Sequence, residues 1–235
     1  ANTHYAFSQW NDSVTSASRN VTVTADASYV ATFAQSEWRL YAVSSDTSKG
    51  TVSLTGWTSG SYFPLGTTKN AVASVVNKAG VTPANSVYKF SGWYRTGYSG
   101  VYYTTASADL YMYAADTTYT ALFEDKATVP VRYSTNDVTH GQATLTLQST
   151  GATVTATGTQ QTAQRTYGFT VTCTATVLDA EYVFAGWYNA VSGGTLLSSD
   201  STYVFTPAES DVSAGLTVYA VFLPLAHLTI STEIL

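Results

Sequence analysis

The stretch Tyr182-Val-Phe184-Ala-Gly186-Trp187-Tyr188 decides how this chain of 235 residues is interpreted, because two related stretches precede it. The other copies are Tyr88-x-Phe90-x-Gly92-Trp93-Tyr94 and Tyr5-x-Phe7-x-x-Trp10. The copies begin 83 and 94 residues apart. Stacked solenoid repeats are shorter, about 20 to 50 residues, whereas a small domain has about this length. The sequence therefore predicts tandem modules that each have a core of their own.

A second marker, a short run ending in phenylalanine, follows every copy: Tyr29-Val-Ala-Thr-Phe33, Tyr119-Thr-Ala-Leu-Phe123 and Tyr219-Ala-Val-Phe222. Upstream of the second and third copies, residues 39–54 correspond to residues 131–145. The first copy has no such upstream half, and residues 228–232 are similar to the opening segment 131–135. We therefore expect the C-terminal half of a repeat at 1–36, complete modules at 37–126 and 127–223, and the opening strand of a further repeat, or a tail, at 224–235.

The composition favours β structure. Only 11% of the residues are charged, 45% are hydrophobic, and threonine, serine, valine and tyrosine are frequent. β-branched and aromatic side chains suit half-buried pleated sheets. Apolar and polar residues alternate with a period of two at 20–25, 51–55, 143–147, 153–157 and 169–173. We predict a mainly β fold of tandem small β-rich modules, either β-grasp-like or sandwich-like, with room for one short helix per module.

Residues 70–79 are the segment where a helix is in question. Val72, Val75, Val76 and Ala79 have helical spacing, and Gly80 is placed to end a helix. The corresponding residues of the next module, 169–177, alternate as a strand. Helix and strand both remain open for this segment.

Net charge and hydropathy exclude two classes of partner. The net charge is −5 and there is no basic run, so we expect no nucleic-acid partner. No stretch approaches the roughly 18 apolar residues of a membrane span, so we expect no membrane insertion within this segment. The single cysteine, Cys173, lies in an alternating stretch and is predicted to be a buried thiol.

The sequence shows no catalytic or metal-binding motif. His4, His140 and His227 are far apart, and neither a second histidine nor a cysteine lies at ligand spacing, so we predict no metal site and no cofactor. There is no nucleophile elbow and no phosphate-binding glycine loop. We therefore predict that the chain is not an enzyme. The alternative, an enzyme with dispersed catalytic residues, requires a deep cleft with convergent titratable groups.

The third copy resembles the bacterial surface repeats of the internalin B-repeat and Listeria–Bacteroides repeat family, including its divergent members. The resemblance rests on Tyr-x-Phe-x-Gly-Trp-Tyr at 182–188, on Gly193-Gly194 and on the closing run 218–222. The second copy shares Phe90-Ser-Gly92-Trp93-Tyr94, whereas Gln9 and Asn11 depart from the pattern in the first. The resemblance implies β-rich modules in secreted or cell-wall proteins of bacteria, an extracellular location, and a stalk, spacer or adhesion role without catalytic residues.

We interpret the repeated motif as structural, with aromatic residues that anchor a core and a glycine that permits close backbone approach. This interpretation covers Tyr5, Phe7, Trp10, Tyr88, Phe90, Gly92, Trp93, Tyr182, Phe184, Gly186 and Trp187.

The candidate ligand-binding residues are Tyr98, Tyr102 and Tyr103, which belong to a tyrosine-rich expected hairpin at 94–113. Exposed tyrosines stack on sugar rings or contact proteins. The alternative function is thus a carbohydrate- or host-glycoprotein-binding module, with host glycans or surface proteins as partners. Cross-strand pairing of the tyrosines is the structural alternative. The sequence does not determine the oligomeric state.

Overall fold

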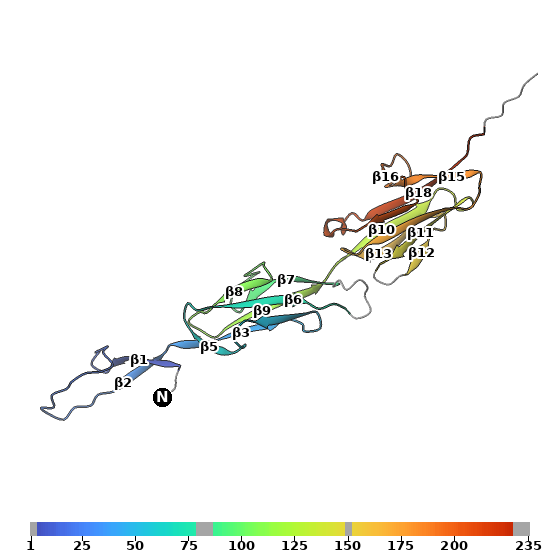
Figure 1. The fold of residues 1–235 in the computed structure, drawn as a ribbon. Coiled ribbons are helices and arrows are strands. Elements are labelled where there is room, and N and C mark those ends of the chain that lie inside the picture. The colour runs from blue at the N-terminus through green and yellow to red at the C-terminus, as the bar shows by residue number, and fades with distance from the viewer. Residues whose placement is uncertain (1–3, 79–86, 149–151, 228–235) are drawn as a thin grey trace, which may run out of the picture. The chain divides into compact units, whose positions relative to one another are not determined.

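The computed structural model describes residues 4–78, 87–148 and 152–227, and nearly all of its regular structure is β (Figure 1). The chain forms two compact units. The first unit comprises Ala1–Val76 and Tyr88–Glu124, and the second comprises Asn77–Val87 and Asp125–Leu235. The prediction of a mainly β, multi-module chain is confirmed. The module boundaries that the repeats suggest, 37–126 and 127–223, stay a prediction.

The first unit holds a hairpin and two sheets. Its strands are β1 (Tyr5–Trp10), β2 (Ala31–Gln35), β3 (Glu37–Ser44), β4 (Gly50–Leu54), β5 (Ser61–Pro64), β6 (Thr68–Val75), β7 (Tyr88–Arg95), β8 (Ser107–Tyr111) and β9 (Thr117–Asp125). β1 pairs with β2 alone. The two sheets have the orders β5-β3-β9-β7 and β4-β6-β8.

The second unit repeats this design with two added strands. Its elements are β10 (Thr128–Thr135), β11 (Gly141–Leu147), β12 (Thr153–Thr155), β13 (Gln161–Thr166), β14 (Val171–Val177), β15 (Tyr182–Tyr188), β16 (Leu196–Ser198), β17 (Thr202–Phe205), the 3-10 turn η1 (Glu209–Asp211) and β18 (Leu216–Pro224). The sheet orders are β13-β10-β18-β15-β16 and β12-β11-β14-β17. Without the edge strands β12 and β16, both orders match those of the first unit.

The opening strand of each two-sheet unit pairs in parallel with its closing strand. β3 pairs with β9 from Leu40↔Thr117 to Ser44↔Ala121. β10 pairs with β18 in the same way, from Val131↔Leu216 to Thr135↔Ala220. Parallel neighbours run in the same direction, so the chain enters each pair of sheets at one end and leaves it at the other.

Each core lies between the two sheets of its unit. In the first, Leu40 and Trp93 from one sheet meet Ala71 and Leu110 from the other. In the second, Val131 and Trp187 meet Leu145 and Cys173. Every second residue of β9 from Thr117 to Phe123 is buried, as expected for a strand with one face on a core. This arrangement is the sandwich-like alternative.

Of the two alternatives left open at 70–79, the described residues take the strand, since β6 extends to Val75. β6 lies between two neighbours, with Ala71 opposite both Leu54 of β4 and Ala108 of β8. Sheet pairing on both sides therefore outweighs the local helical spacing. Gly80, the expected helix end, lies outside the described residues. Within the described ranges, η1 is the sole helical element.

The strand expected from the alternation at 20–25 is wrong, because the segment forms no strand. It lies between β1 and β2, the position that β8 occupies between β7 and β9. β8 pairs with β6, whereas no described strand of that kind accompanies the β1–β2 hairpin. Val23 is accordingly 75% exposed. An alternating sequence without a neighbouring strand cannot satisfy its backbone groups in a sheet.

The repeated motif and the closing phenylalanine meet in an aromatic cluster in all three copies. The clusters are Phe7–Trp10–Phe33, Phe90–Trp93–Phe123 and Phe184–Trp187–Phe222, in which the motif phenylalanine lies 5.5–6.0 Å from the two other rings. In the third copy the pairing register shifts between Phe184 and Gly186. Gly186 has φ +143°, and a Cβ there would lie 2.4 Å from Leu196 Cδ1, so the position requires glycine.

Candidate functional site

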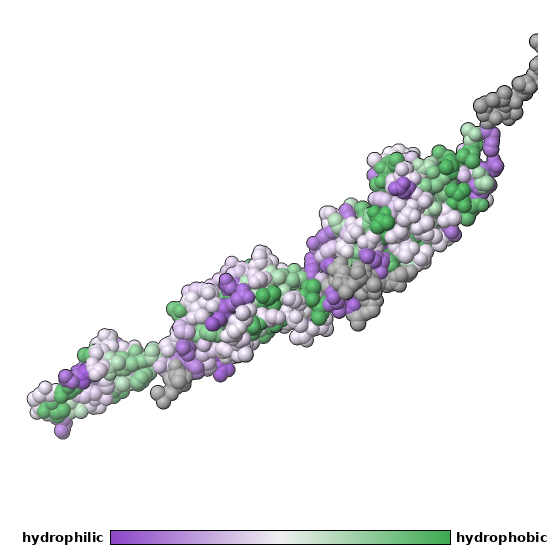
Figure 2. All heavy atoms as spheres, in the orientation of Figure 1, coloured by the Kyte–Doolittle hydropathy of each residue, from purple (hydrophilic) through white to green (hydrophobic). Residues whose placement is uncertain are grey.

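The motif residues of the two complete sandwiches lie in or beside the cores. Trp93 and Trp187 have no exposed surface, and Tyr88 and Tyr182 are half-buried. Tyr5 of the hairpin is 46% exposed. On the visible face, residues of intermediate hydropathy separate small hydrophilic and hydrophobic groups (Figure 2).

The predicted tyrosine hairpin follows β7. The backbone N–H of Tyr102 donates to the Trp93 carbonyl at 2.7 Å, and Trp93 forms an antiparallel bridge with Tyr103. A turn closes where the N–H of Tyr98 donates to the Arg95 carbonyl at 3.1 Å. The loop thereby brings side chains from both of its arms together.

The three candidate tyrosines have different surroundings. Tyr103 is half-buried, its hydroxyl donates to the Asp109 carbonyl at 3.0 Å, and burial raises the pKa of its phenol. Tyr98 is 51% exposed and meets Tyr102 edge to face, with 4.9 Å between ring centroids. The hydroxyls of Tyr102 and Tyr113 share a hydrogen bond, which raises the pKa of Tyr102 to about 12. Tyr98 thus remains as the exposed candidate, whereas Tyr102 and Tyr103 are half-buried and held by their hydroxyl groups.

Arg95 lies among these tyrosines, and the sequence reasoning did not include it. Its Cζ is 4.1 Å from the ring centre of Tyr113, 5.0 Å from that of Tyr102 and 5.6 Å from that of Tyr98. We call Arg95, Tyr98, Tyr102 and Tyr113 the Arg95 cluster. The signal in the sequence was the contrast between copies, because Asn189 follows Trp187-Tyr188 where Arg95 follows Trp93-Tyr94.

A pocket of about 370 Å³ opens in the second unit. Its lining includes Leu197, Tyr203 and Phe205, together with Arg132, whose Nη1 donates to the Ala214 carbonyl at 3.0 Å. Histidine, cysteine and carboxylate side chains are missing from the lining. The pocket therefore holds no nucleophile paired with a base.

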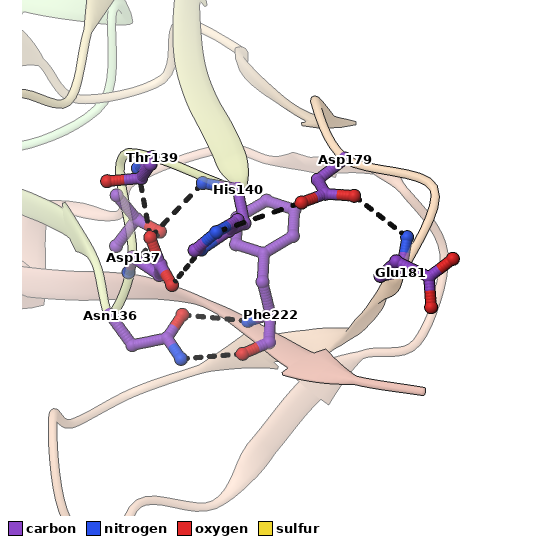
Figure 3. A network of polar contacts seen from close by, with 8 residues as sticks. Asn136, Asp137, Thr139, His140, Asp179, Glu181 and Phe222 are labelled. Carbon is purple, nitrogen blue, oxygen red and sulfur yellow. Dashed lines mark hydrogen bonds and ion pairs between the residues drawn. The ribbon is translucent and has the colours of Figure 1, made fainter. Parts of the chain in front are cut away.

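A polar network joins two turns of the second unit (Figure 3). His140 Nδ1 lies 2.6 Å from Asp137 Oδ2, and His140 Nε2 lies 3.8 Å from Asp179 Oδ2. The imidazole stacks on Tyr182 at 3.9 Å. The hydrogen bond with His140 holds the pKa of Asp137 below its usual value. Sequence reasoning did not bring Asp179 to His140, since the two residues are distant in the chain.

The same region ties the closing strand to the turn after β10. The Asn136 side chain accepts from the Phe222 N–H and donates to the Phe222 carbonyl, each at 2.7 Å (Figure 3). We interpret the network as a clamp that holds the turn after β10 to β18 through Asn136 and to the turn at Asp179 through His140. In the residues with described positions, no group of three or more histidine, cysteine, aspartate or glutamate side chains is arranged to hold a metal ion.

Comparison of the sequence with protein-family models and with curated proteins gives no match. Comparison with solved structures finds similar chains with low TM-scores and low sequence identity. The C-terminal fragment of pilus adhesin SpaC from Lactobacillus rhamnosus GG has a TM-score of 0.34 and 13% identity over 83% of this chain and 100% of that chain. The major pilin protein T3.2 from Streptococcus pyogenes has a TM-score of 0.25 and 13% identity over 68% of each chain. TM-scores this low assign neither a fold family nor a function to the chain. Among the described residues, no helix has the length and hydropathy to cross a membrane.

Proposed function

We propose that this chain is a non-enzymatic tandem-repeat segment of a bacterial cell-surface or secreted protein, in which it acts as a load-bearing stalk or spacer. The observation that carries the proposal is the parallel pairing of first and last strands, β3 with β9 and β10 with β18. The resemblance of the three motif copies to internalin B-type surface repeats supports the bacterial and extracellular setting.

Parallel terminal strands resist a pulling force for a geometric reason. A force applied at the start of β10 and the end of β18 slides the two strands past each other. All hydrogen bonds of the register from Val131↔Leu216 to Thr135↔Ala220 then carry load together. A force that peels the same strands apart breaks these bonds one after another. Modules joined in series through such ends should therefore open only at a higher tension than modules that are peeled apart.

Single-molecule pulling on the full chain tests the proposal. Handles attached through Thr128→Cys and Leu223→Cys load the β10–β18 pair in shear. Handles attached through Thr128→Cys and Ser213→Cys act at the same end of that pair and peel it apart. Thr128, Ser213 and Leu223 are exposed, whereas Cys173 is buried and does not compete for the handles. We expect the shear geometry to rupture at a several-fold higher force. Equal rupture forces in the two geometries would count against a load-bearing role.

Adhesion is the second candidate function, and the Arg95 cluster is the observation that favours it. The cluster presents the exposed Tyr98 beside a cation in the first unit. The second unit has Asn189 in place of Arg95, and the following residues up to Ser198 include no tyrosine. The candidate function predicts that glycan or glycoprotein ligands bind the first unit and leave the second unchanged. Ligand contacts on both units alike would exclude this site as the cause of binding.

A further inference from the structure

We infer that the Arg95 cluster binds the carboxylate of an acidic saccharide, an inference that rests on the adhesion candidate and deepens it. The guanidinium would hold the carboxylate, and the neighbouring tyrosine rings would pack against the sugar. The inference depends on the pairing of each arginine, on the geometry of the cluster and on the difference between the two units.

Arg95 differs from the other four arginines in having no oxygen partner. The oxygen partners of the others are Asp12 for Arg19, the Tyr41 hydroxyl for Arg39, the Ala214 carbonyl for Arg132 and the Gln164 carbonyl for Arg165. Within the described part of the chain, the Arg95 guanidinium forms neither a hydrogen bond nor an ion pair and has only aromatic contacts. An arginine remains charged at all physiological pH values. Its donors are therefore available to an external anion.

The geometry of the cluster limits how that anion can approach. Arg95 Nε is buried without a partner, so a ligand must meet the two terminal Nη groups. Guanidinium N–H groups match the two oxygens of a carboxylate. The rings of Tyr102 and Tyr113 lie within 5.0 Å of the Arg95 Cζ. They exclude water from one part of the guanidinium, which strengthens its attraction for an anion.

The tyrosines favour a saccharide as the bearer of the carboxylate. Tyr98 is exposed and stands edge to face against Tyr102, which gives the site two ring surfaces at an angle. A pyranose has an apolar C–H face that packs on such a ring while its hydroxyls remain in water. The hydrogen bond between Tyr102 and Tyr113 fixes the inner wall, so little side-chain entropy is lost on binding.

A titration of the full chain with 3′-sialyllactose and with lactose, followed by NMR on arginine Nε–Hε and backbone amide signals, tests the inference. The two sugars share the lactose part and differ by the carboxylate-bearing residue. We expect sialyllactose to shift the Arg95 signal and the amides of residues 95–103. Lactose should bind about tenfold or more weakly, since a charge-assisted hydrogen bond contributes about 1.5–3 kcal/mol. Added salt should weaken the binding of sialyllactose, which carries the charge, and should leave the binding of lactose unchanged.

Matched variants locate the effect. Arg95→Gln should remove the preference for sialyllactose over lactose. Tyr98→Ala should weaken the binding of both sugars. Asn189→Ala, at the corresponding position of the second unit, should change neither. Arg95→Lys keeps the positive charge without the planar fork. It should therefore retain only part of the preference, which keeps the test valid if Arg95→Gln disturbs the loop.

The contrary outcomes separate this inference from the functions proposed above. Equal binding of lactose and sialyllactose at the cluster would overturn the acidic class and leave adhesion standing. If a glutamate-rich peptide binds the cluster and neither sugar does, the assignment of a saccharide ligand is wrong and the partner is a protein. No shift with any of these ligands would overturn the site itself. The pulling experiment is independent of all three results.

Discussion

The motif tryptophans of the two complete sandwiches, Trp93 and Trp187, differ by a single hydrogen bond. Trp93 Nε1 donates to the Ala106 carbonyl at 3.2 Å, whereas Trp187 Nε1 is buried without a partner. Replacing either by phenylalanine removes the indole N–H and leaves a similar space. Only Trp93→Phe also deprives a carbonyl of its donor. We expect Trp93→Phe to lower the free energy of unfolding by about 1 kcal/mol more than Trp187→Phe does.

Urea unfolding of both variants, with each unit followed by its own NMR signals, measures this difference. An equal loss in the two units would mean that the hydrogen bond of Trp93 contributes nothing net.

Cys173 links burial to a dependence on pH. It has no exposed surface, and burial raises the pKa of its thiol to about 12. In the unfolded chain the thiol has a pKa of about 8.5. The folded state therefore favours the protonated thiol. The contribution of this preference to the stability of the fold is complete below about pH 8.5 and is lost progressively as pH rises toward 12. Between pH 7 and pH 10 the stability of the second unit should fall more steeply than in Cys173→Ala, as measured by urea midpoints. Parallel curves for the two proteins would contradict this prediction.

The sequence predicted some residues of the candidate site and not others, for a physical reason. Tyr98, Tyr102 and Tyr103 are close in sequence, so their clustering in one loop could be predicted. Their division into exposed and anchored side chains depends on Asp109 and Tyr113, which belong to the next strand and its end. Arg95 became a candidate only because the fold places the rings of Tyr98, Tyr102 and Tyr113 around its guanidinium.

Among the elements, the β1–β2 hairpin can be compared directly with β15–β18. Both have a register shift beside the motif phenylalanine, between Phe7 and Gln9 in one and between Phe184 and Gly186 in the other. The same three aromatic positions cluster in each. Phe33 is nevertheless 59% exposed, whereas Phe222 is 1% exposed. In the described residues β2 has no strand of the β10 type at its other edge.

This difference in exposure predicts unequal effects of one substitution. Phe222→Ala should cost about 3–5 kcal/mol of unfolding free energy in the second unit, because it empties space in a packed core. Phe33→Ala should change the stability by about 0.5 kcal/mol or less. Chemical unfolding of the two variants gives the comparison. A cost above about 2 kcal/mol for Phe33→Ala would show that the hairpin face is covered in solution.

The wrong expectation at 20–25 and the choice left open at 70–79 have the same cause as this difference. The pattern at 20–25 has the alternation of a strand, and the pattern at 70–79 has the spacing of a helix. The outcome depended on neighbours, because β6 has partners on both sides and residues 20–25 have none of the β6 type in the described chain. The spacing and the propensity of residues describe a single segment, whereas the formation of a strand also depends on the segments that pair with it.

For the molecule as a whole, the two cores share no residue, since one is built from the first unit and the other from the second. The units should therefore unfold separately. Leu40 and Leu145 have no exposed surface and belong to different cores. Leu40→Ala should lower the stability of the first unit by about 2–5 kcal/mol and leave the second unchanged, with Leu145→Ala giving the reverse.

Differential scanning calorimetry combined with NMR signals of each unit tests this independence. A single transition that both variants shift equally would show that the units unfold as one. The repeats predicted this modularity from the sequence, because each motif copy brings a complete aromatic cluster. The parallel pairing of opening and closing strands could not be predicted in that way, since it joins segments from opposite ends of a module.

That pairing also fixes the order in which a module is completed during synthesis. Val131 of β10 cannot pair until Leu216 of β18, its partner 85 residues later in the chain, has been synthesised. At a synthesis rate of about 5–20 residues per second, the wait lasts roughly 4–17 s. Throughout that interval the sheet lacks β18, the strand that lies between β10 and β15. The module therefore cannot close its sheet until its last strand has been made.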